Sequence, residues 1–201
     1  MAIAPYDERL DRLLDTAARV FAEKGYHPTT MRDLARATGM SLAGMYYYVP
    51  SKDDLLYLIQ ERCFQEVLEG AEATLRDAGS PYERLQRFIR HHVTFFARHM
   101  PAMKVLSHEA GALDADRDAK IDALKRRYVT ILEGLLIEVG LPPDTDATRV
   151  AGFALFGMMN WIYTWYRLDG TVAPEGLADQ IGSIFLNGVL DTSSTSAPQG
   201  G

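Results

Sequence analysis

Two tyrosines and a lysine in the first quarter of the chain carry side chains suited to binding a phosphate backbone. The hydroxyls of Tyr46 and Tyr47 can donate hydrogen bonds to phosphates or to base edges. Lys52 lies near the start of an expected helix, whose free N–H groups and positive dipole end also favour a phosphate. A solvated lysine beside Asp53 and Asp54 is the alternative interpretation, because surface ion pairs are common and weak.

Two short helices joined by a tight turn are expected to position these side chains. Thr30 and Asp33 have the spacing of a capping box, which predicts a short helix after Thr30. Gly39 can adopt the positive φ of a sharp turn, and Ser41 can cap a second short helix. This spacing is typical of a helix-turn-helix, whose second helix enters the major groove of DNA. A corner between two helices with no DNA-binding role is the alternative.

The residues of the second helix that pack into the core determine which face remains available to contact DNA. Met40 and Met45 are expected to point into a small core, and Ala35 is small enough for the two helices to approach closely. Leu42 and Ala43 cannot form bidentate hydrogen bonds with bases, so we expect recognition to depend on few polar groups and on DNA shape. The positions expected to face outward are Ser41, Leu42, Ala43, Tyr46 and Tyr47.

Composition excludes some classes of protein. The 201 residues carry a net charge of −6 and a single cysteine, Cys63, which rules out a basic bulk composition and a disulfide framework. Residues 19–52 are nevertheless locally basic, with five lysines and arginines against two acidic residues. The first residues are acidic and lack the apolar run of a secretory signal, so we expect a cytoplasmic protein.

Spacings typical of catalytic or metal sites do not occur in the sequence. It contains no phosphate-cradling glycine loop, no GxSxG and no HExxH motif. His92 and His99 are two helical turns apart, which is not the spacing of a tight pair of metal ligands. We therefore expect no enzyme activity, no cofactor and no metal.

Helical periodicity and helix stop signals run through almost the whole chain. No pair of strands and no internal repeat is evident, so the sequence predicts an all-α fold of nine helices. Three helices would form an N-terminal head at residues 1–50 and six a body at residues 51–191, before a disordered tail at residues 192–201. The expected helices cover about residues 10–24, 31–37, 42–47, 52–78, 81–99, 101–110, 114–139, 145–168 and 174–190.

The uncharged segment from residue 150 to 166 is too short for a typical membrane span. A spanning helix needs about 20 apolar residues. This segment has 17 residues and contains Gly152, Gly157 and Asn160. We expect a buried core helix and no contact with a membrane.

The last two expected helices are apolar on more than one face. Their glycines, including Gly152 and Gly182, allow close helix packing. This pattern predicts a four-helix interface between two copies related by a two-fold axis, and packing within one chain is the alternative. The expected interface residues are Phe153, Phe156, Gly157, Ile181, Ile184, Phe185 and Val189.

Methionines and aromatic residues cluster in two stretches that we expect to line an apolar ligand pocket. Such side chains form adaptable pockets in which a few polar groups orient the ligand. Ordinary core packing is the alternative for each residue, because these types are usually buried. The expected pocket residues are Phe88, His92, Phe95, Phe96, His99, Met103, Met158, Trp161, Ile162, Trp165 and Arg167.

The segment from residue 8 to 58 resembles the N-terminal domain of TetR-family transcriptional repressors, and the nine-helix layout is also similar to that family. The resemblance implies that Thr30, Tyr46 and Lys52 contact phosphates, and that Ser41 caps the recognition helix. It also implies that the groove-facing residues are Leu42, Ala43, Gly44 and Tyr47. The residues that carry the resemblance are Phe21-Ala22-Glu23-Lys24-Gly25-Tyr26, Thr29-Thr30-Met31-Arg32-Asp33-Leu34-Ala35 and Gly39-Met40-Ser41-Leu42-Ala43-Gly44-Met45-Tyr46-Tyr47-Tyr48-Val49-Pro50-Ser51-Lys52.

A second and shorter resemblance concerns the ligand. Residues 156–167, followed by Asp169-Gly170, are similar to the eighth helix of TetR members that regulate fatty-acid or acyl-CoA catabolism. Such members respond to acyl-CoA thioesters. The resemblance implies that Arg167, Arg90 or Arg98 meets the CoA phosphates, and a solvent-facing arginine is the alternative for each.

Together these patterns predict a homodimeric repressor that binds a pseudo-palindromic DNA operator and is released by a hydrophobic small molecule, such as an acyl-CoA or fatty acid. Effector binding would shift the fourth helix, which joins head and body, and move the two heads out of register. Two rival hypotheses remain open. One is a small-molecule carrier or enzyme without DNA affinity, and the other is a scaffold whose helix-turn-helix binds protein.

Overall fold

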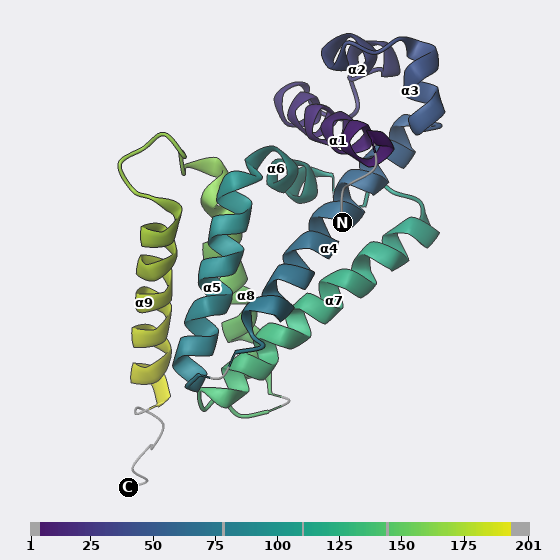
Figure 1. Ribbon diagram of the computed structural model, residues 1–201. Coiled ribbons are helices and arrows are strands. Elements are labelled where there is room, and N and C mark those ends of the chain that lie inside the picture. The colour runs from purple at the N-terminus through teal and green to yellow at the C-terminus, as the bar shows by residue number, and fades with distance from the viewer. Residues whose placement is uncertain (1–4, 78, 110, 144, 194–201) are drawn as a thin grey trace, which may run out of the picture. The chain divides into compact units, whose positions relative to one another are not determined.

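The computed structural model is helical throughout the part that it describes, residues 5–77, 79–109, 111–143 and 145–193 (Figure 1). This part contains nine α-helices and one short 3₁₀ helix and has no strand, which confirms the all-helical prediction. None of these helices is long and apolar enough to span a membrane. The elements are α1 (Pro5–Lys24), α2 (Met31–Thr38), α3 (Leu42–Tyr48), α4 (Lys52–Thr74), α5 (Pro81–Arg98), α6 (Met100–His108), α7 (Ala115–Glu138), α8 (Asp146–Asn160), the 3₁₀ helix η1 (Trp161–Thr164) and α9 (Pro174–Ser193).

The chain forms two compact units, each built from two separate stretches of sequence. Unit 1 comprises residues 1–66 and 99–125, and unit 2 comprises residues 67–98 and 126–201. Helices α4 and α7 therefore each contribute residues to both units. The units do not follow the predicted boundary at residue 50, because α6 and the first parts of α4 and α7 are grouped with the N-terminal helices.

The core of unit 1 joins the three N-terminal helices to α4 and α6. Apolar side chains of α1, α2, α3 and α4, together with Val105 of α6, form one buried cluster. A cation on α4 also links this helix to α1 at the surface. The Arg62 guanidinium lies 3.1 Å from the carboxylate of Asp11 on α1 and also pairs with Asp15. The helix-turn-helix therefore packs against α1 and α4, and these two helices are joined to each other by the ion pairs of Arg62.

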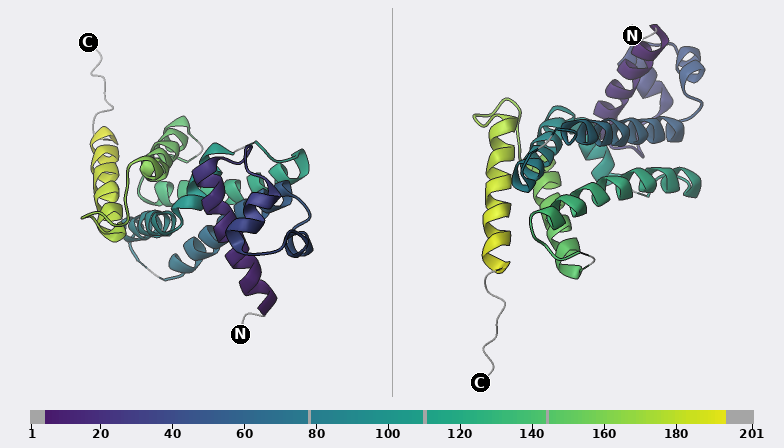
Figure 2. Two further views of the ribbon diagram at one scale, coloured as in Figure 1. Left: turned by 90° about the horizontal axis from the view of Figure 1, so that it is seen from above. Right: turned by 60° about the horizontal axis from the view of Figure 1, so that its bottom comes forward.

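In unit 2, α5 packs against both α8 and α9 (Figures 1 and 2). Arg90 of α5 holds the carboxylate of Asp179 on α9 with two bonds of 2.6 and 2.7 Å. Gly182 faces this edge of α5, since a Cβ at this position would lie 2.1 Å from the Gln86 side-chain oxygen and would displace that side chain. The α5–α9 pair is thus joined by polar side chains along its edge as well as by its apolar core.

The eighth helix is shorter than predicted. It ends at Asn160, and a 3₁₀ turn follows, whereas the sequence predicted a helix through Leu168. Residues 161–166 are all aromatic or β-branched, and such side chains lose rotamer freedom in an α-helix. The tighter turn buries Ile162 and Tyr166, and this burial favours the turn over a continued helix.

The last helix continues to Ser193, so Thr192 and Ser193 belong to α9 rather than to the predicted tail. Residues 194–201 lie outside the described part of the chain. The side chain of Val189, which was predicted at a dimer interface, also lies outside the described residues.

Candidate nucleic-acid interface and effector site

Helix α2 begins at the capping box predicted for Thr30 and Asp33. The Asp33 amide donates to the Thr30 hydroxyl oxygen at 3.2 Å. The Asp33 carboxylate accepts from the Thr30 hydroxyl at 2.7 Å and from the Thr30 amide at 3.0 Å. The bond from the hydroxyl is the main cause that lowers the pKa of Asp33, because it stabilises the carboxylate form. Thr30 is exposed, and its hydroxyl proton already has a carboxylate acceptor.

The turn between α2 and α3 has the geometry that the sequence predicts. Gly39 has a φ of 68°, in the left-handed region that favours glycine, and ends α2. The amide of Met40 donates to the Ala35 carbonyl at 3.0 Å and closes the turn. Ser41 then caps α3, since its hydroxyl oxygen accepts from the Gly44 amide at 3.0 Å. Local bonds therefore fix both the end of α2 and the start of α3.

Helix α3 presents tyrosines on the face opposite its core contact. Met45 is fully buried, whereas Tyr46 and Tyr47 are 49% and 74% exposed. Ser41 and Ala43 are also exposed. Leu42 was predicted to face outward, but it is half-buried and packs against the core of unit 1, because its position at the start of α3 brings it close to that core.

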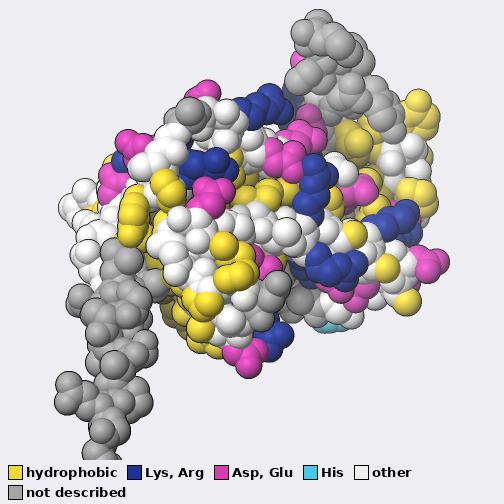
Figure 3. All heavy atoms as spheres, turned by 90° about the horizontal axis from the view of Figure 1, so that it is seen from below, with side chains coloured by type: hydrophobic (Ala, Val, Ile, Leu, Met, Phe, Trp, Pro, Cys, Tyr) yellow, Lys and Arg dark blue, Asp and Glu magenta, His cyan; other side chains and the backbone are white. Residues whose placement is uncertain are grey.

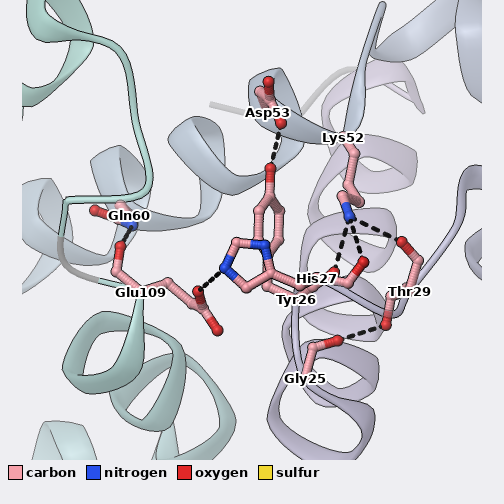
Figure 4. A network of polar contacts seen from close by, with 8 residues as sticks. All are labelled: Gly25, Tyr26, His27, Thr29, Lys52, Asp53, Gln60 and Glu109. Atoms are coloured by element: carbon pink, nitrogen blue, oxygen red, sulfur yellow. Dashed lines mark hydrogen bonds and ion pairs between the residues drawn. The ribbon is translucent and has the colours of Figure 1, made fainter.

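The ammonium of Lys52 points into the loop between α1 and α2 (Figure 4). Its Nζ donates to the carbonyl oxygens of Tyr26 at 2.9 Å, His27 at 3.2 Å and Thr29 at 3.0 Å. An ammonium has three N–H groups, so these backbone acceptors use all of them. This geometry does not support the phosphate contact that the resemblance implies for Lys52.

The same loop is tied to α4 and to the end of α6 by two acidic residues. The Tyr26 hydroxyl donates to the Asp53 carboxylate, and burial together with this bond raises the pKa of Tyr26 above its usual value. His27 Nε2 lies 3.7 Å from the carboxylate of Glu109, the residue that caps the C-terminus of α6. The Glu109 carbonyl accepts from the Gln60 amide at 3.4 Å. The loop is thus held by contacts from α4 and from the end of α6.

Three of the predicted pocket residues meet in the core of unit 2. Phe88, His92 and Phe96 lie on α5, and the ring centres of His92 and Phe96 are 4.7 Å apart. Tyr128 of α7 and Phe156 of α8 complete the cluster, each with its ring centre 5.8 Å from that of His92. Phe156 was predicted at the dimer interface, but its ring faces α5 and is buried within the unit.

His92 is the polar centre of this aromatic cluster. Its Nδ1 lies 3.1 Å from the Tyr128 hydroxyl, and its Nε2 lies 3.0 Å from Asn160 Oδ1. Burial disfavours the imidazolium and lowers the pKa of His92 to about 3, although the bond to Asn160 opposes this shift. A neutral imidazole offers one donor and one acceptor, which these two partners match. Sequence reasoning missed Tyr128, whose phenol at an otherwise apolar position of α7 was the available signal.

The other predicted pocket residues differ in exposure, and Phe95 has its ring centre 5.2 Å from that of Phe96. Trp161 and Trp165 are 61% and 57% exposed, because the chain leaves the α-helix at Asn160. The exposed Arg167 guanidinium pairs with its neighbour Asp169 at 3.2 Å. Ile162 is buried. The remaining residues of the predicted set are Phe95 and Met158, which are half-buried in unit 2, and His99 and Met103, which belong to unit 1.

The arginines considered for CoA phosphates are all engaged in ion pairs. Arg90 is held by Asp179, and Arg98 lies 2.8 Å from Glu175, both on α9. Arg167 pairs with Asp169. An anionic ligand would have to compete with a carboxylate at each of these three positions.

The predicted interface residues divide into an exposed and a buried group. Phe153 of α8 and Ile184 of α9 are 58% and 65% exposed, and Gly157 is exposed one turn beyond Phe153. Val150, which was not predicted, extends the exposed apolar row on α8. On the face shown in Figure 3, hydrophobic side chains likewise reach the surface beside charged ones. The predicted interface residues that are buried within unit 2 are Phe156, Ile181 and Phe185.

A hollow of about 290 Å³ lies between α7 and α8, apart from the aromatic cluster. Its lining is mostly polar and differs from that expected of an apolar pocket. The hollow is lined by Glu133, Ile137, Thr145, Asp146, Thr148 and Arg149.

No group of three or more metal-binding side chains occurs among the residues whose positions are described.

A three-helix head with a helix-turn-helix, followed by an all-helical body, defines a class of DNA-binding transcription regulators. Residues 13–57 match the family model described as bacterial regulatory proteins of the tetR family. Residues 78–189 match the model described as the tetracyclin repressor-like C-terminal domain. The chain belongs to the TetR family and is a DNA-binding transcriptional repressor, not an enzyme.

Several relatives resemble the chain along most of its length. The fatty acid metabolism regulator protein of Bacillus subtilis is 23% identical over 182 residues, which cover 89% of this chain and 94% of the relative. The crystal structure of PfmR, a TetR-family regulator from Thermus thermophilus, has 32% identity and a TM-score of 0.79, covering 88% of this chain and 98% of that one. The crystal structure of AibR in complex with isovaleryl coenzyme A and operator DNA has 32% identity and a TM-score of 0.76, and the match covers 88% of this chain and 97% of AibR.

Proposed function

We propose that the repressor acts as a homodimer whose two α3 helices enter successive major grooves of a pseudo-palindromic operator. The observation that carries this proposal is the exposure of Tyr46 and Tyr47 on a helix whose start is fixed by Ser41. Hydroxyls on such a helix can donate to phosphates and base edges. In the complex, the two recognition helices would be separated by about one turn of DNA, roughly 34–36 Å.

The DNA-binding head would comprise residues 1–50, and residues 51–191 would bind the effector and form the dimer. Thr30 would contribute to DNA binding in one of two ways. Its hydroxyl would donate to a phosphate in place of the Asp33 carboxylate, or it would act only as the cap that fixes the start of α2. Leu42 is left out of the proposed contacts because it packs against the core of unit 1. The proposed DNA-contacting residues are Thr30, Ser41, Ala43, Gly44, Tyr46 and Tyr47.

The exposed apolar residues of α8 and α9 support a dimer built from these two helices. Val150, Phe153 and Gly157 follow one another at helical spacing, and Ile184 is exposed on α9. Two copies that pair through α8 and α9 would remove these side chains from water, and Gly157 would allow close packing. Phe156, Ile181 and Phe185 would support the interface from behind.

The effector would be a hydrophobic small molecule, with an acyl-CoA or fatty acid as the first class to test. AibR, whose structure contains isovaleryl coenzyme A, and the Bacillus subtilis fatty acid regulator motivate this class. The aromatic cluster around His92 offers an apolar lining with a polar centre for the acyl part and its thioester. Binding there would require the cluster to rearrange, and α4, which has residues in both units, would carry the change toward the head.

The test begins with a DNA duplex enriched by the wild-type protein from a random pool of about 30 base pairs, long enough for two half-sites one turn apart. The affinity for this duplex is then measured with isovaleryl-CoA, a longer acyl-CoA, the free fatty acids and CoA alone. We expect an acyl compound to weaken DNA binding while CoA alone does not. Enrichment of no duplex would reject the operator model, and unchanged affinity with every acyl compound would reject this effector class.

A further inference from the structure

We infer that Lys52 is a positioning residue, which holds the loop between α1 and α2 in the conformation that DNA binding needs, and that it is not a ligand of a DNA phosphate. This inference rests on the proposed DNA-binding role of α2 and α3. It differs from the role that the family resemblance implies for this lysine.

The contacts of the ammonium carry the inference. Three carbonyl oxygens, from Tyr26, His27 and Thr29, lie 2.9–3.2 Å from Nζ. The ring centre of Tyr26 lies 4.3 Å from the same nitrogen, so an aromatic face covers it from a further side. A phosphate could bind only after at least one of these bonds had broken, because an ammonium has no fourth N–H group.

The chain has a clear reason to place a cation at this point. Gly25 has a φ of 86° and reverses the direction of the chain after α1. Thr29 is buried, and its hydroxyl donates to the Gly25 carbonyl at 2.7 Å, which closes the loop on itself. This curvature turns several carbonyl oxygens toward one another, and a positive charge offsets their mutual repulsion.

The loop leads directly into the helix-turn-helix. Thr30, the cap of α2, follows Thr29 in sequence, so a change in the loop moves the first residue of α2. Met40 closes the turn to α3 through a bond to Ala35 of α2, and α3 therefore follows α2. Loss of the three Lys52 bonds would displace the uncharged Tyr46 and Tyr47 from their positions on the duplex without removing a contact between a cation and a phosphate.

The two roles of Lys52 differ in their dependence on salt. A lysine that binds a phosphate releases a counterion, so its removal lowers the slope of log affinity against log salt concentration by about 0.9 per contact. Removal of a positioning lysine lowers the affinity at every salt concentration and leaves the slope unchanged, because no cation is lost from the interface. Arginine also separates the roles, because its planar fork can bind a phosphate but does not reproduce three bonds that converge on one atom.

The experiment uses the full chain, the enriched duplex described above and three variants, Lys52→Met, Lys52→Arg and Lys24→Met. Lys24 is an exposed lysine at the end of α1 and serves as the matched control. Affinity is measured across a salt series. Hydrogen exchange at residues 25–34 is measured in the absence of DNA, so that the loop is tested even if no duplex is enriched.

We expect Lys52→Met and Lys52→Arg each to lower the affinity by about tenfold or more with an unchanged salt slope. We also expect faster exchange at Thr29 and in the first turn of α2 in both variants, but not in Lys24→Met. A reduced slope in Lys52→Met with wild-type affinity in Lys52→Arg would overturn the inference, as would wild-type exchange in both variants. If Lys52→Met does not fold, Lys52→Arg decides by the same two readouts. Failure of the wild type to enrich any duplex would reject the operator model alone, because the exchange data would still decide the role of Lys52 in the loop.

Discussion

His92 on α5 lies 3.0 Å, through its Nε2, from the side-chain oxygen of Asn160, the last residue of α8. This bond joins the polar centre of the aromatic cluster to the point at which the chain leaves the α-helix. A ligand that rearranged the cluster would therefore act directly on the end of α8. His92 is buried, and burial lowers its pKa.

The stability of the protein should fall as the pH falls below about 6.5, the usual pKa of a histidine. The pKa of His92 is lowered to about 3 in the folded chain, so the unfolded chain binds a proton that the folded chain does not. Between these two values the free energy of unfolding should decrease by about 1.4 kcal/mol per pH unit from this residue alone. His91, whose pKa is also lowered by burial, acts in the same direction.

Urea unfolding at several pH values, for the wild type and for His92→Gln, measures this effect. We expect the variant to be less stable at neutral pH and to lose part of the pH dependence. His27→Gln, at an exposed histidine, is the substitution control. Equal pH dependence in the wild type and His92→Gln would show that the imidazole is not held neutral.

Tyr46→Phe should weaken binding to the enriched duplex by about 10- to 150-fold, because a hydrogen bond to a charged phosphate contributes roughly 1.5–3 kcal/mol. The variant keeps the ring and removes only the hydroxyl, so the fold should not change. Tyr82→Phe is a matched control, since Tyr82 is also an exposed tyrosine but lies on α5. Fluorescence anisotropy with labelled duplex gives the comparison. Equal affinities of the two variants would remove the Tyr46 hydroxyl from the proposed contacts.

Gly39→Ala should destabilise the helix-turn-helix by about 1 kcal/mol, since the φ of 68° is unfavourable for residues with a Cβ. An added Cβ at Gly39 would meet nothing within 4 Å, so the cost comes from the backbone alone. Gly134 of α7 is equally open and lies inside a helix, and Gly134→Ala should therefore stabilise by about 0.5–1 kcal/mol. Thermal unfolding of both variants tests whether Gly39→Ala lowers and Gly134→Ala raises the stability of the protein. A stabilising Gly39→Ala would contradict the turn geometry.

Ile184→Glu should dissociate the proposed dimer, because the exposed isoleucine would be replaced by a carboxylate that is buried without a partner. We expect the dissociation constant to rise by at least about a hundredfold, from a cost of roughly 3 kcal/mol or more. Ala123→Glu, at an exposed position of α7, is the control. Light scattering across a concentration series measures the mass. If Ile184→Glu remains as dimeric as the control, α9 does not form the interface through this residue.

The sequence predicted the helix-turn-helix well because its signals are local. The bond between Thr30 and Asp33, the positive φ of Gly39 and the cap at Ser41 involve residues at most three positions apart, so their spacing alone specifies them. The end of α8 was predicted wrongly for the opposite reason. Whether the chain continues as a helix beyond Asn160 depends on which side chains of residues 161–166 are buried against other helices. That burial depends on the tertiary structure and cannot be derived from local spacing.

By itself, the sequence determined the helical class, the start and turn of the DNA-binding motif and the family resemblance that the comparisons confirmed. Only the tertiary structure decided which way the long and aromatic side chains point. Phe156 is buried and Trp161 is exposed, although both are apolar, because the neighbours on each side of a helix determine what it buries. The Lys52 ammonium turns to three carbonyls that lie more than twenty residues earlier in the chain, and no spacing rule relates them.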